Sequence, residues 1–296
     1  MRLLNYYKYL FAISGIILIL GIASLAVFGL KLGIDFKGGT VSEIEFQQTI
    51  DQGKLRSVLE AGGIQNYQLQ LTGEKGVIIR TESLEKEQHD KMNADIRSQV
   101  GEFTEKRFDS FGPVVGEELK KKAIYQLLLV SLGIVLYIAY AFRKVARPIT
   151  PWQFGLAAII ALVHDLLIVL GIFSLLGHFY NVEVDSLFVT AILTVLGFSV
   201  HDTIIVFDRI RENLKVYAGQ SVEFIVNHSI SQTLVRSLNT SLTVLFVLLA
   251  MLMFGGETIR YFVLALFIGI AAGTYSSIFV AAPILVLFQN WKNRKR

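Results

Sequence analysis

Six long apolar stretches dominate the sequence and limit the folds that it can adopt. They cover roughly residues 9–30, 123–142, 152–176, 187–207, 237–254 and 261–288 of the 296-residue chain, which is 53% hydrophobic. A helix needs about 20 apolar residues to cross a bilayer. The first stretch is longer than the roughly 7–15 residues of a signal-peptide core, so an uncleaved helix is expected there. The sequence predicts an α-helical polytopic membrane protein with six transmembrane helices.

Residues 31–120 have a different composition, rich in charges of both signs. Alternation and turn residues predict strands at 41–46, 67–71, 77–81 and 103–111, with helices at 51–61 and 84–100. This βαββαβ order is typical of a ferredoxin-like α+β domain. About 80 residues are enough for a modest core.

The basic residues predict the membrane orientation. They gather in segment 1–30 ahead of its apolar run, in the 143–148 loop, in the 209–236 connection and in the 289–296 tail. Loops rich in Lys and Arg face the cytoplasm, so both termini are expected there and residues 31–120 outside. Five transmembrane helices are then expected within 121–288. Within the 209–236 connection, residues 221–234 have the pattern of an amphipathic helix at the membrane interface.

Composition also excludes several classes of function. The chain has no cysteine, which rules out disulfides and thiolate metal sites, and no other metal-ligand cluster is found. Its net charge of +4 comes mostly from loops that set topology, so no nucleic-acid binding is expected. No nucleotide-binding or nucleophile motif occurs. We expect no enzyme, no cofactor and no metal.

Asp202 is the most informative single residue, because it lies inside the fourth apolar stretch. An aspartate at the centre of a membrane helix costs roughly 2.5–3.5 kcal/mol on insertion scales. Such a carboxylate has to face protein or a wet cavity, and it usually marks an ion pathway. The sequence therefore predicts that Asp202 lies on a proton or cation pathway. The alternative is a structural carboxylate that is hydrogen-bonded to a neighbouring helix.

A His-Asp pair occurs twice, as His164-Asp165 in the third apolar stretch and His201-Asp202 in the fourth. Both side chains can titrate, so two such pairs on adjacent helices could form a proton relay. Each histidine is rotated about 100° from its aspartate around the helix, so it could instead face elsewhere. Metal ligation by the four side chains is chemically feasible and less favoured.

Arg236 begins the fifth apolar stretch and precedes the polar membrane residues Asn239, Thr240 and Ser241. Most arginines at such a boundary extend to the membrane surface and set topology. The alternative is that Arg236 reaches Asp202 and alternates between pairing and release. The sequence leaves both interpretations open.

Gly269 and Gly273 form a GxxxG pattern in the sixth stretch. Small residues at this spacing allow another helix to approach closely. Packing within the chain is favoured over a subunit interface.

Several of these stretches together resemble one family, the SecD/SecF protein-export membrane proteins. Gly33-Ile34-Asp35-Phe36-Lys37-Gly38-Gly39 resembles the family's GG signature. The match extends to residues 114–116, 161–165, 197–213, 236–241 and 254–256. Nearly the whole chain is covered by the resemblance.

The resemblance implies a fold, a site and partners. The family belongs to the RND superfamily, so six transmembrane helices form one half of a twelve-helix bundle that SecD completes. Asp202 and Arg236 fall on the family's essential charged residues, and Asp165 matches less securely. Asp35, Gly38 and Gly39 are expected to couple the bundle to the outer domain.

Further expectations follow from the family's role in late protein translocation, driven by the proton or sodium gradient. The expected partners are the SecYEG channel, with YajC and YidC as further candidates, together with unfolded preprotein and membrane lipid. The bacterial cytoplasmic (inner) membrane is the expected location.

Two other functions remain open. One is an RND-type exporter of small molecules or lipids, which would need a ligand pocket in the outer part. The sequence of 31–120 shows no apolar cleft of that kind. The other is a passive membrane scaffold whose outer domain only docks partners.

Overall fold

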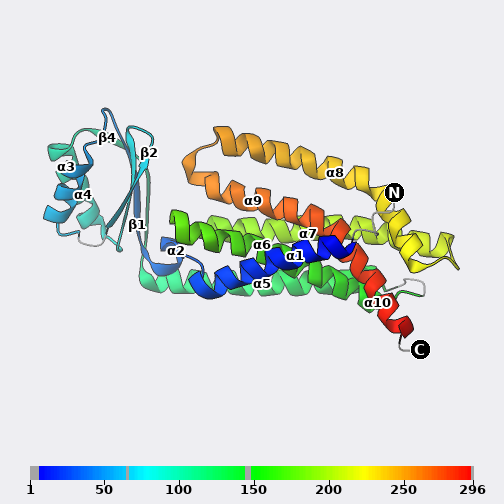
Figure 1. Cartoon of the computed structure of the whole chain (residues 1–296). Helices are drawn as coiled ribbons and strands as arrows, with labels where there is room; N and C mark the ends of the chain where they lie inside the picture. Colours follow the sequence, from blue (N-terminus) through cyan, green and yellow to red (C-terminus); the bar gives the residue numbers. More distant parts are fainter. Residues whose placement is uncertain (1–6, 65–66, 144–147, 295–296) are drawn as a thin grey trace. The chain divides into compact units, whose positions relative to one another are not determined.

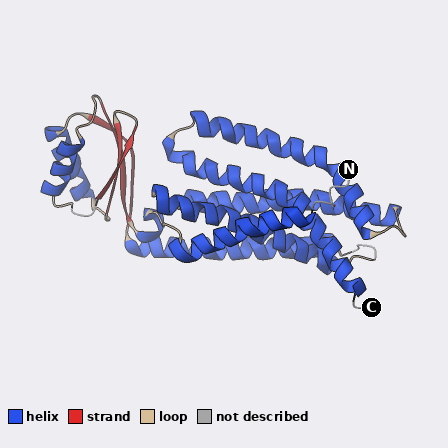
Figure 2. Cartoon of the chain, in the orientation of Figure 1, coloured by secondary structure: helices blue, strands red, loops and turns tan. Residues whose placement is uncertain are grey.

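The computed structural model describes residues 7–64, 67–143 and 148–294. The chain divides into two compact units, one made of Met1–Lys31 with Tyr125–Arg296 and the other of Leu32–Ile124. The first unit is a helix bundle, and the second holds the described strands (Figure 2).

The smaller unit is a four-stranded antiparallel sheet with two helices on one face (Figure 1). Its strands are β1 (Gly39–Phe46), β2 (Tyr67–Thr72), β3 (Gly76–Thr81) and β4 (Phe103–Phe111), in the order β2-β3-β1-β4. The two helices are α3 (Gln52–Ala61) and α4 (Lys86–Gln99). This agrees with the βαββαβ order expected from the sequence.

Alternation along the strands builds the core of this unit. Ile44 and Phe46 of β1 point to the helix side, while Glu45 between them is exposed. They pack with Leu55 of α3 and Ile96 of α4, both fully buried. Period-two burial on the strands thus meets the apolar stripes of two amphipathic helices.

The glycine pair ahead of β1 is held in a backbone conformation that disfavours other residues. It follows the short helix α2 (Ile34–Lys37), and φ is +79° at Gly38 and +142° at Gly39. A Cβ on Gly38 would lie 2.8 Å from the backbone of Pro113, and one on Gly39 would lie 2.8 Å from O of Thr81. Both positive φ and lack of space therefore require glycine.

Six helices among the described residues are long and apolar enough to cross a membrane. They are α1 (Tyr7–Phe28), α5 (Pro113–Ala141), α6 (Pro151–Tyr180), α7 (Ser186–Val216), α8 (Val222–Phe254) and a sixth built from three consecutive segments. Those segments are α9 (Glu257–Ser276), a π turn labelled η2 (Ser277–Ala281) and α10 (Ala282–Arg294). The larger unit holds these six helices, except for the part of α5 as far as Ile124, which belongs to the smaller unit. The structure confirms the prediction of six helices that can cross a membrane.

Local signals fix where these helices begin and end. Pro151 occupies the first turn of α6 after a capping box formed by Thr150 and Gln153. Asn181 ends that helix in the left-handed conformation, at φ 57°. The carboxylate of Asp185 then caps α7 by accepting a bond from the N–H of Phe188, at 2.8 Å.

Small residues bring pairs of helices into close contact. A Cβ on Gly171 of α6 would lie 2.5 Å from Cα of Gly21 in α1, so these backbones almost touch. A Cβ on Gly269 of α9 would lie 2.3 Å from Cγ2 of Val195 in α7. Close approach through small residues is the usual way that helices associate in a bilayer.

Three details differ from the sequence expectations. Residues 221–234 are not a separate interfacial helix but the first part of α8, because no Gly or Pro interrupts the chain before Ser237. The sequence predicts a charged helical lead-in at 117–122 before the second apolar stretch, and α5 begins four residues earlier, at Pro113, a favourable first position. The expected tail at 289–296 is helical as far as Arg294.

Some of the basic residues that predict the membrane orientation are not covered by the structure. Residues 1–6, 144–147 and 295–296, which carry several of the basic side chains, lie outside the described residues.

Candidate functional site

Asp202 lies in the middle of α7 and is 5% exposed. Its Oδ2 accepts a hydrogen bond of 3.2 Å from the hydroxyl of Ser241 in α8. The hydroxyl of Thr274 in α9 lies 3.4 Å from the same oxygen and 2.7 Å from Oγ of Ser241. The carboxylate is therefore enclosed by three helices and contacted through hydroxyl groups.

Asp165 forms a second carboxylate centre, on α6, and is fully buried. Its Oδ2 accepts hydrogen bonds from Ser199 of α7 at 2.5 Å and from Ser276 of α9 at 2.7 Å. Its Oδ1 lies 2.9 Å from Nδ1 of the preceding residue, His164. Asp165 thus joins three helices, as Asp202 does.

The two carboxylate centres share two helices. Ser199 and Asp202 are three residues apart in α7, about 4.5 Å along the axis. Thr274, which contacts Asp202, and Ser276, which contacts Asp165, are two residues apart in α9. A movement of α9 against α7 therefore changes the surroundings of both aspartates.

Gly273 makes this arrangement compact. A Cβ at this position would lie 3.0 Å from Cβ of Ser199 and 3.5 Å from Oδ2 of Asp165. The GxxxG pattern of Gly269 and Gly273 therefore lies at the contact between α9 and α7, within this chain.

Arg236 lies apart from Asp202 in this structure. Arg236 is exposed, and its side chain forms no ion pair with any other described residue. It lines a cavity of about 530 Å³ between α7 and α8, together with Ile204, Ile205, Asp208, Arg209, Glu212, Gln232 and Thr233. The two acids of this cavity pair with other arginines, Asp208 with Arg211 at 2.6 Å and Glu212 with Arg209 at 2.7 Å. The alternation of Arg236 between pairing and release stays a prediction.

The remaining predicted membrane residues divide into buried and exposed ones. Ser241 reaches Asp202, whereas Asn239 and Thr240 lie on the exposed face of α8. His201 is exposed although Asp202 beside it is buried. The two His-Asp pairs are therefore not equivalent, because only His164 turns inward with its aspartate.

The predicted coupling motif lies in the smaller unit. Asp35 in α2 is buried, and Gly38 and Gly39 form the turn into β1. A Cβ on Gly116, in the first turns of α5, would lie 2.8 Å from N of Gly38. The glycine pair thus packs directly against the start of α5, backbone on backbone.

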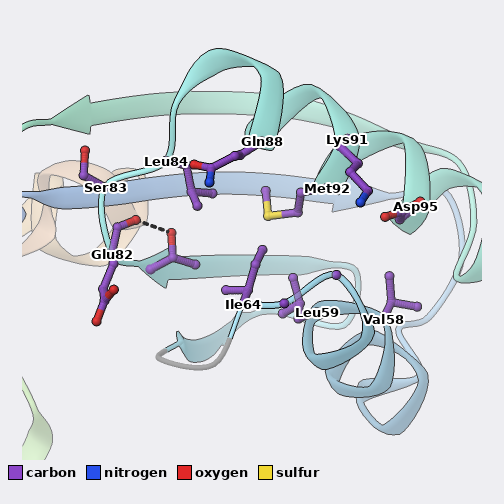
Figure 3. A pocket seen from close by; sticks show the side chains of 13 residues that line it. Val58, Leu59, Ile64, Glu82, Ser83, Leu84, Gln88, Lys91, Met92 and Asp95 are labelled. Carbon is purple, nitrogen blue, oxygen red and sulfur yellow. Dashed lines mark hydrogen bonds between the residues drawn. The ribbon is translucent and has the colours of Figure 1, made fainter.

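The smaller unit also contains a hollow that the sequence did not indicate (Figure 3). Its volume is about 350 Å³, and it lies between α3 and α4 beside the end of β3. Its lining combines apolar, polar and charged side chains; those labelled are Val58, Leu59, Ile64, Glu82, Ser83, Leu84, Gln88, Lys91, Met92 and Asp95. Most of the surface that lines the hollow is polar, so it is not the apolar-rich cleft whose absence from 31–120 was expected. Gly62 and Gly63, at the end of α3, are among its lining residues.

Sequence reasoning missed the hydroxyl groups that hold the aspartates. Ser199, Thr274 and Ser276 were not singled out, since hydroxyl residues are common in membrane helices and often bond their own backbone. One signal was present, because Thr274 and Ser276 follow Gly273 directly in a helix with few other polar residues. Among the described residues, no group of three or more acids and histidines could hold a metal ion.

Comparison with known proteins identifies the family. The profile described as "Protein export membrane protein SecD/SecF, C-terminal" matches residues 91–291, and the "SecD/SecF GG Motif" matches residues 23–50. The protein translocase subunit SecF of Thermobaculum terrenum is 47% identical over 96% of this chain and 93% of its own length. The SecF of Pseudomonas aeruginosa is 37% identical over 93% of this chain and 87% of its own.

Solved structures agree with the sequence comparisons. SecDF from Thermus thermophilus, described as a translocon-associated membrane protein, matches with a TM-score of 0.84 and 34% identity over 98% of this chain. A SecDF in a super-membrane-facing form matches with a TM-score of 0.70 and 33% identity, also over 98%. This chain spans 39% of each of those longer chains. It is a multi-pass membrane protein and belongs to the SecD/SecF family of protein-export membrane proteins, among its SecF members.

Proposed function

We propose that this chain is the SecF half of a SecD–SecF machine, which uses an ion gradient to promote late steps of protein export. The observation that carries the proposal is Asp202, a carboxylate enclosed in a membrane bundle and contacted by the hydroxyls of Ser241 and Thr274. A carboxylate that costs this much to insert marks an ion or proton pathway by default. The transport role named for the relatives favours export over catalysis.

The energy available at such a site is sufficient for a conformational change. One charge that crosses the membrane potential releases about 2.3 kcal/mol per 100 mV. A factor of ten in a two-state equilibrium needs about 1.4 kcal/mol. Proton binding at Asp202 would weaken its attraction for Arg236, so that α8 and α9 repack around α7. Residues 31–39 and 113–119, which contain the glycine pair and the start of α5, would carry the movement to the outer domain.

The exposed face of α7 supports a membrane partner. Its exposed positions include Thr190, Thr194, Gly197 and His201, which lie on one face of the helix. The exposed face of α5, in contrast, carries Leu128, Leu129, Leu132 and Leu136. The hydroxyls of Thr190 and Thr194 bond carbonyls of their own helix, but lipid offers the exposed imidazole of His201 no hydrogen-bonding partner. We therefore assign the α7 face to SecD, which would supply the other six transmembrane helices.

The remaining partners and the orientation rest on family membership. They are the SecYEG channel with YajC and YidC, unfolded preprotein and surrounding lipid, in the bacterial cytoplasmic (inner) membrane with both termini in the cytoplasm. Whether protons or sodium ions drive the cycle would follow from replacing one gradient by the other.

The decisive experiment compares the wild type with Asp202→Asn in membrane vesicles that contain the complete export machinery. Asparagine keeps the shape and can still accept a hydrogen bond, but it cannot take up a proton. We expect the gradient-stimulated part of preprotein translocation to be lost while SecD still co-purifies. Glu223→Gln, which neutralises an exposed acid in the first turn of α8, serves as the matched control. Unchanged stimulation in Asp202→Asn would falsify the proposal.

The same variant separates the rival functions. A passive scaffold tolerates Asp202→Asn, because all contacts of the outer domain remain. An RND-type exporter loses activity as well, but its loss produces sensitivity to drugs or lipids in place of preprotein accumulation. The hollow between α3 and α4 gives the exporter a candidate pocket, and Met92→Trp would fill it. Normal export in that variant supports the protein-export role.

A further inference from the structure

The pair formed by His164 and Asp165 is buried more deeply than the Asp202 centre, and the mechanism above does not use it. Asp165 is fully buried, and His164 is 3% exposed. The residues before and after them in α6 are apolar, from Leu162-Val163 to Leu166-Leu167. Two ionisable groups in such surroundings cost free energy that a leucine pair would not.

One atom of this pair has no partner. Nδ1 of His164 lies 2.9 Å from Oδ1 of Asp165, whereas Nε2 is buried and has no hydrogen-bonding partner among the described residues. A neutral imidazole that donates through Nδ1 carries a lone pair at Nε2. The atom is buried, and no described residue donates a hydrogen bond to it.

We propose that the His164–Asp165 pair is a second proton-binding site of the bundle, which takes up its proton at Nε2 of His164. A hydronium ion supplies the proton: one of its O–H bonds breaks, which leaves water, and one N–H bond forms at Nε2. Neutral imidazole becomes imidazolium, and Asp165 stays a carboxylate that balances the new charge. No other bond changes. The two serine hydroxyls that donate to Oδ2 of Asp165 hold the carboxylate in place in both states.

The surroundings of the pair contain few other titratable groups. From α9 comes Tyr275, whose ring lies 6.2 Å from that of His164 and whose hydroxyl bonds O of Leu10 and lies 3.0 Å from Oγ of Ser14. From α7 comes Asp202, one turn beyond Ser199. The sequence of α1 from Leu10 to Phe28, the π turn and α10 as far as Gln289 contain no acid or base. Asp165 is thus the nearest counter-charge for an imidazolium.

The second site is placed to communicate with the first. Ser276 holds Asp165, and Thr274 holds Asp202, so one short segment of α9 contacts both aspartates. The π turn begins at Ser277, directly after this segment. Such turns are frequent at functional sites in helices. A role of this proton in transport rests on the export function proposed above. Binding of the proton itself does not depend on export.

Nitrogen-15 NMR of the full chain in lipid bilayers tests proton binding directly. The chain contains five histidines, and the signals of His164 are those that vanish in His164→Gln. Between about pH 9 and about pH 5 we expect Nε2 to change from unprotonated to protonated while Nδ1 stays protonated. Asp165→Asn should move the midpoint of this step, because it removes the counter-charge. A His164 that keeps a single neutral tautomer over the whole range overturns the proposal.

A matched variant separates proton binding from a structural role. His178→Gln makes the same substitution in the same helix, where the ring stacks on Phe28 at 3.9 Å. Its His164 signals should titrate as in the wild type. If Asp165 only joins three helices, then Asp165→Asn lowers stability but leaves the midpoint unchanged, which also contradicts the proposal.

The vesicle assay adds a functional result that can fail independently. We expect His164→Gln to abolish the pH dependence of gradient-stimulated export below neutrality, and His178→Gln to retain it. Failure of Asp202→Asn to affect export, together with a normal His164 titration, would refute the proposed function alone. Loss of gradient-stimulated export in Asp202→Asn, together with a His164 whose NMR signals do not change with pH, would refute the second site alone.

Discussion

Ser199 of α7 donates a 2.5 Å hydrogen bond to Oδ2 of Asp165 in α6. The two residues are 34 positions apart in the sequence, and both are buried. This bond joins neighbouring membrane helices through a carboxylate that lipid could not satisfy. It also places the Asp165 centre within one helical turn of Asp202.

Removal of this hydroxyl should destabilise the bundle. Ser199→Ala takes a donor from a buried carboxylate, and hydrogen bonds to charged groups contribute about 1.5–3 kcal/mol. We expect a lower midpoint of thermal unfolding in detergent. The control is Ser231→Ala, whose hydroxyl bonds only the carbonyl of Asn227 in its own helix, at 3.0 Å. Equal midpoints for the two variants would show that the bond contributes little.

Thr274→Val should weaken export more than it weakens the fold. Valine keeps the shape of threonine but removes the hydroxyl that lies between Asp202 and Ser241. We expect slower gradient-stimulated translocation with nearly normal amounts of protein in the membrane. Thr243→Val is the control, because that hydroxyl is exposed and bonds O of Thr240 in its own helix. Thr274→Ser should restore the rate, and failure to do so would point to packing instead.

Gly39→Ala should disturb the turn into β1 beyond the effect of backbone strain. The new Cβ would meet O of Thr81 at 2.8 Å and Cγ2 of Ile34 at 2.9 Å. Gly63→Ala provides the control, because φ there is also positive, at +85°, but nothing lies within 4 Å. Strain alone costs roughly 1–2 kcal/mol. Limited proteolysis of the full chain should therefore cut residues 31–120 faster in Gly39→Ala than in Gly63→Ala.

Gly269→Ala should be rescued by a second substitution across the helix contact. The added methyl would overlap Val195, and Val195→Ala removes the overlapping carbons. We expect Gly269→Ala to lower the unfolding midpoint and the double variant to recover most of it, a coupling typical of residues in direct contact. Gly133→Ala, with open space around the new methyl, should have no such effect. Additive losses would contradict the contact.

Gly197→Leu should interfere with SecD binding and leave this chain folded. Gly197 is exposed on α7, and a Cβ there meets nothing within 4 Å. A leucine would therefore protrude from the face assigned to SecD. The matched control is Gly133→Leu, at an exposed glycine of α5 with equally open surroundings. Loss of SecD co-purification is expected for the first variant only; equal retention in both would place SecD elsewhere.

Much of the fold could be predicted from the sequence, because two strong periodicities dominate it. Runs of about 20 apolar residues set the six membrane-crossing helices, and alternation with turn glycines set the small α+β unit. The ends of the helices were harder to predict. The charged segment 117–122 was expected to be helical, and a 2.7 Å ion pair between Glu118 and Lys122 at i,i+4 spacing supports α5 there. The four residues of α5 before it, from Pro113, carry no such signal.

The candidate site could be predicted only in part. A membrane aspartate is conspicuous in a sequence, so Asp202 and Asp165 were found. Their partners come from helices far away in the chain, as with Ser276, which lies 111 positions from Asp165. The orientation of a side chain around its helix also depends on packing. This explains why His164 turns inward while His201, in the same dipeptide, is exposed.

The π turn at Ser277–Ala281 begins directly after Ser276, the residue that bonds Asp165. A π turn holds one residue more than an α turn, and its backbone bonds can exchange between i+4 and i+5 partners without breaking the helix. If the π turn moved by one turn along the helix, the residues of that turn would rotate by about 100° around the helix axis. The helix on either side would keep its place. Such a step would swing Ser276 away from Asp165 and keep α10 anchored. The last membrane helix would then change its register beside the segment of α9 that contacts Asp165 and Asp202.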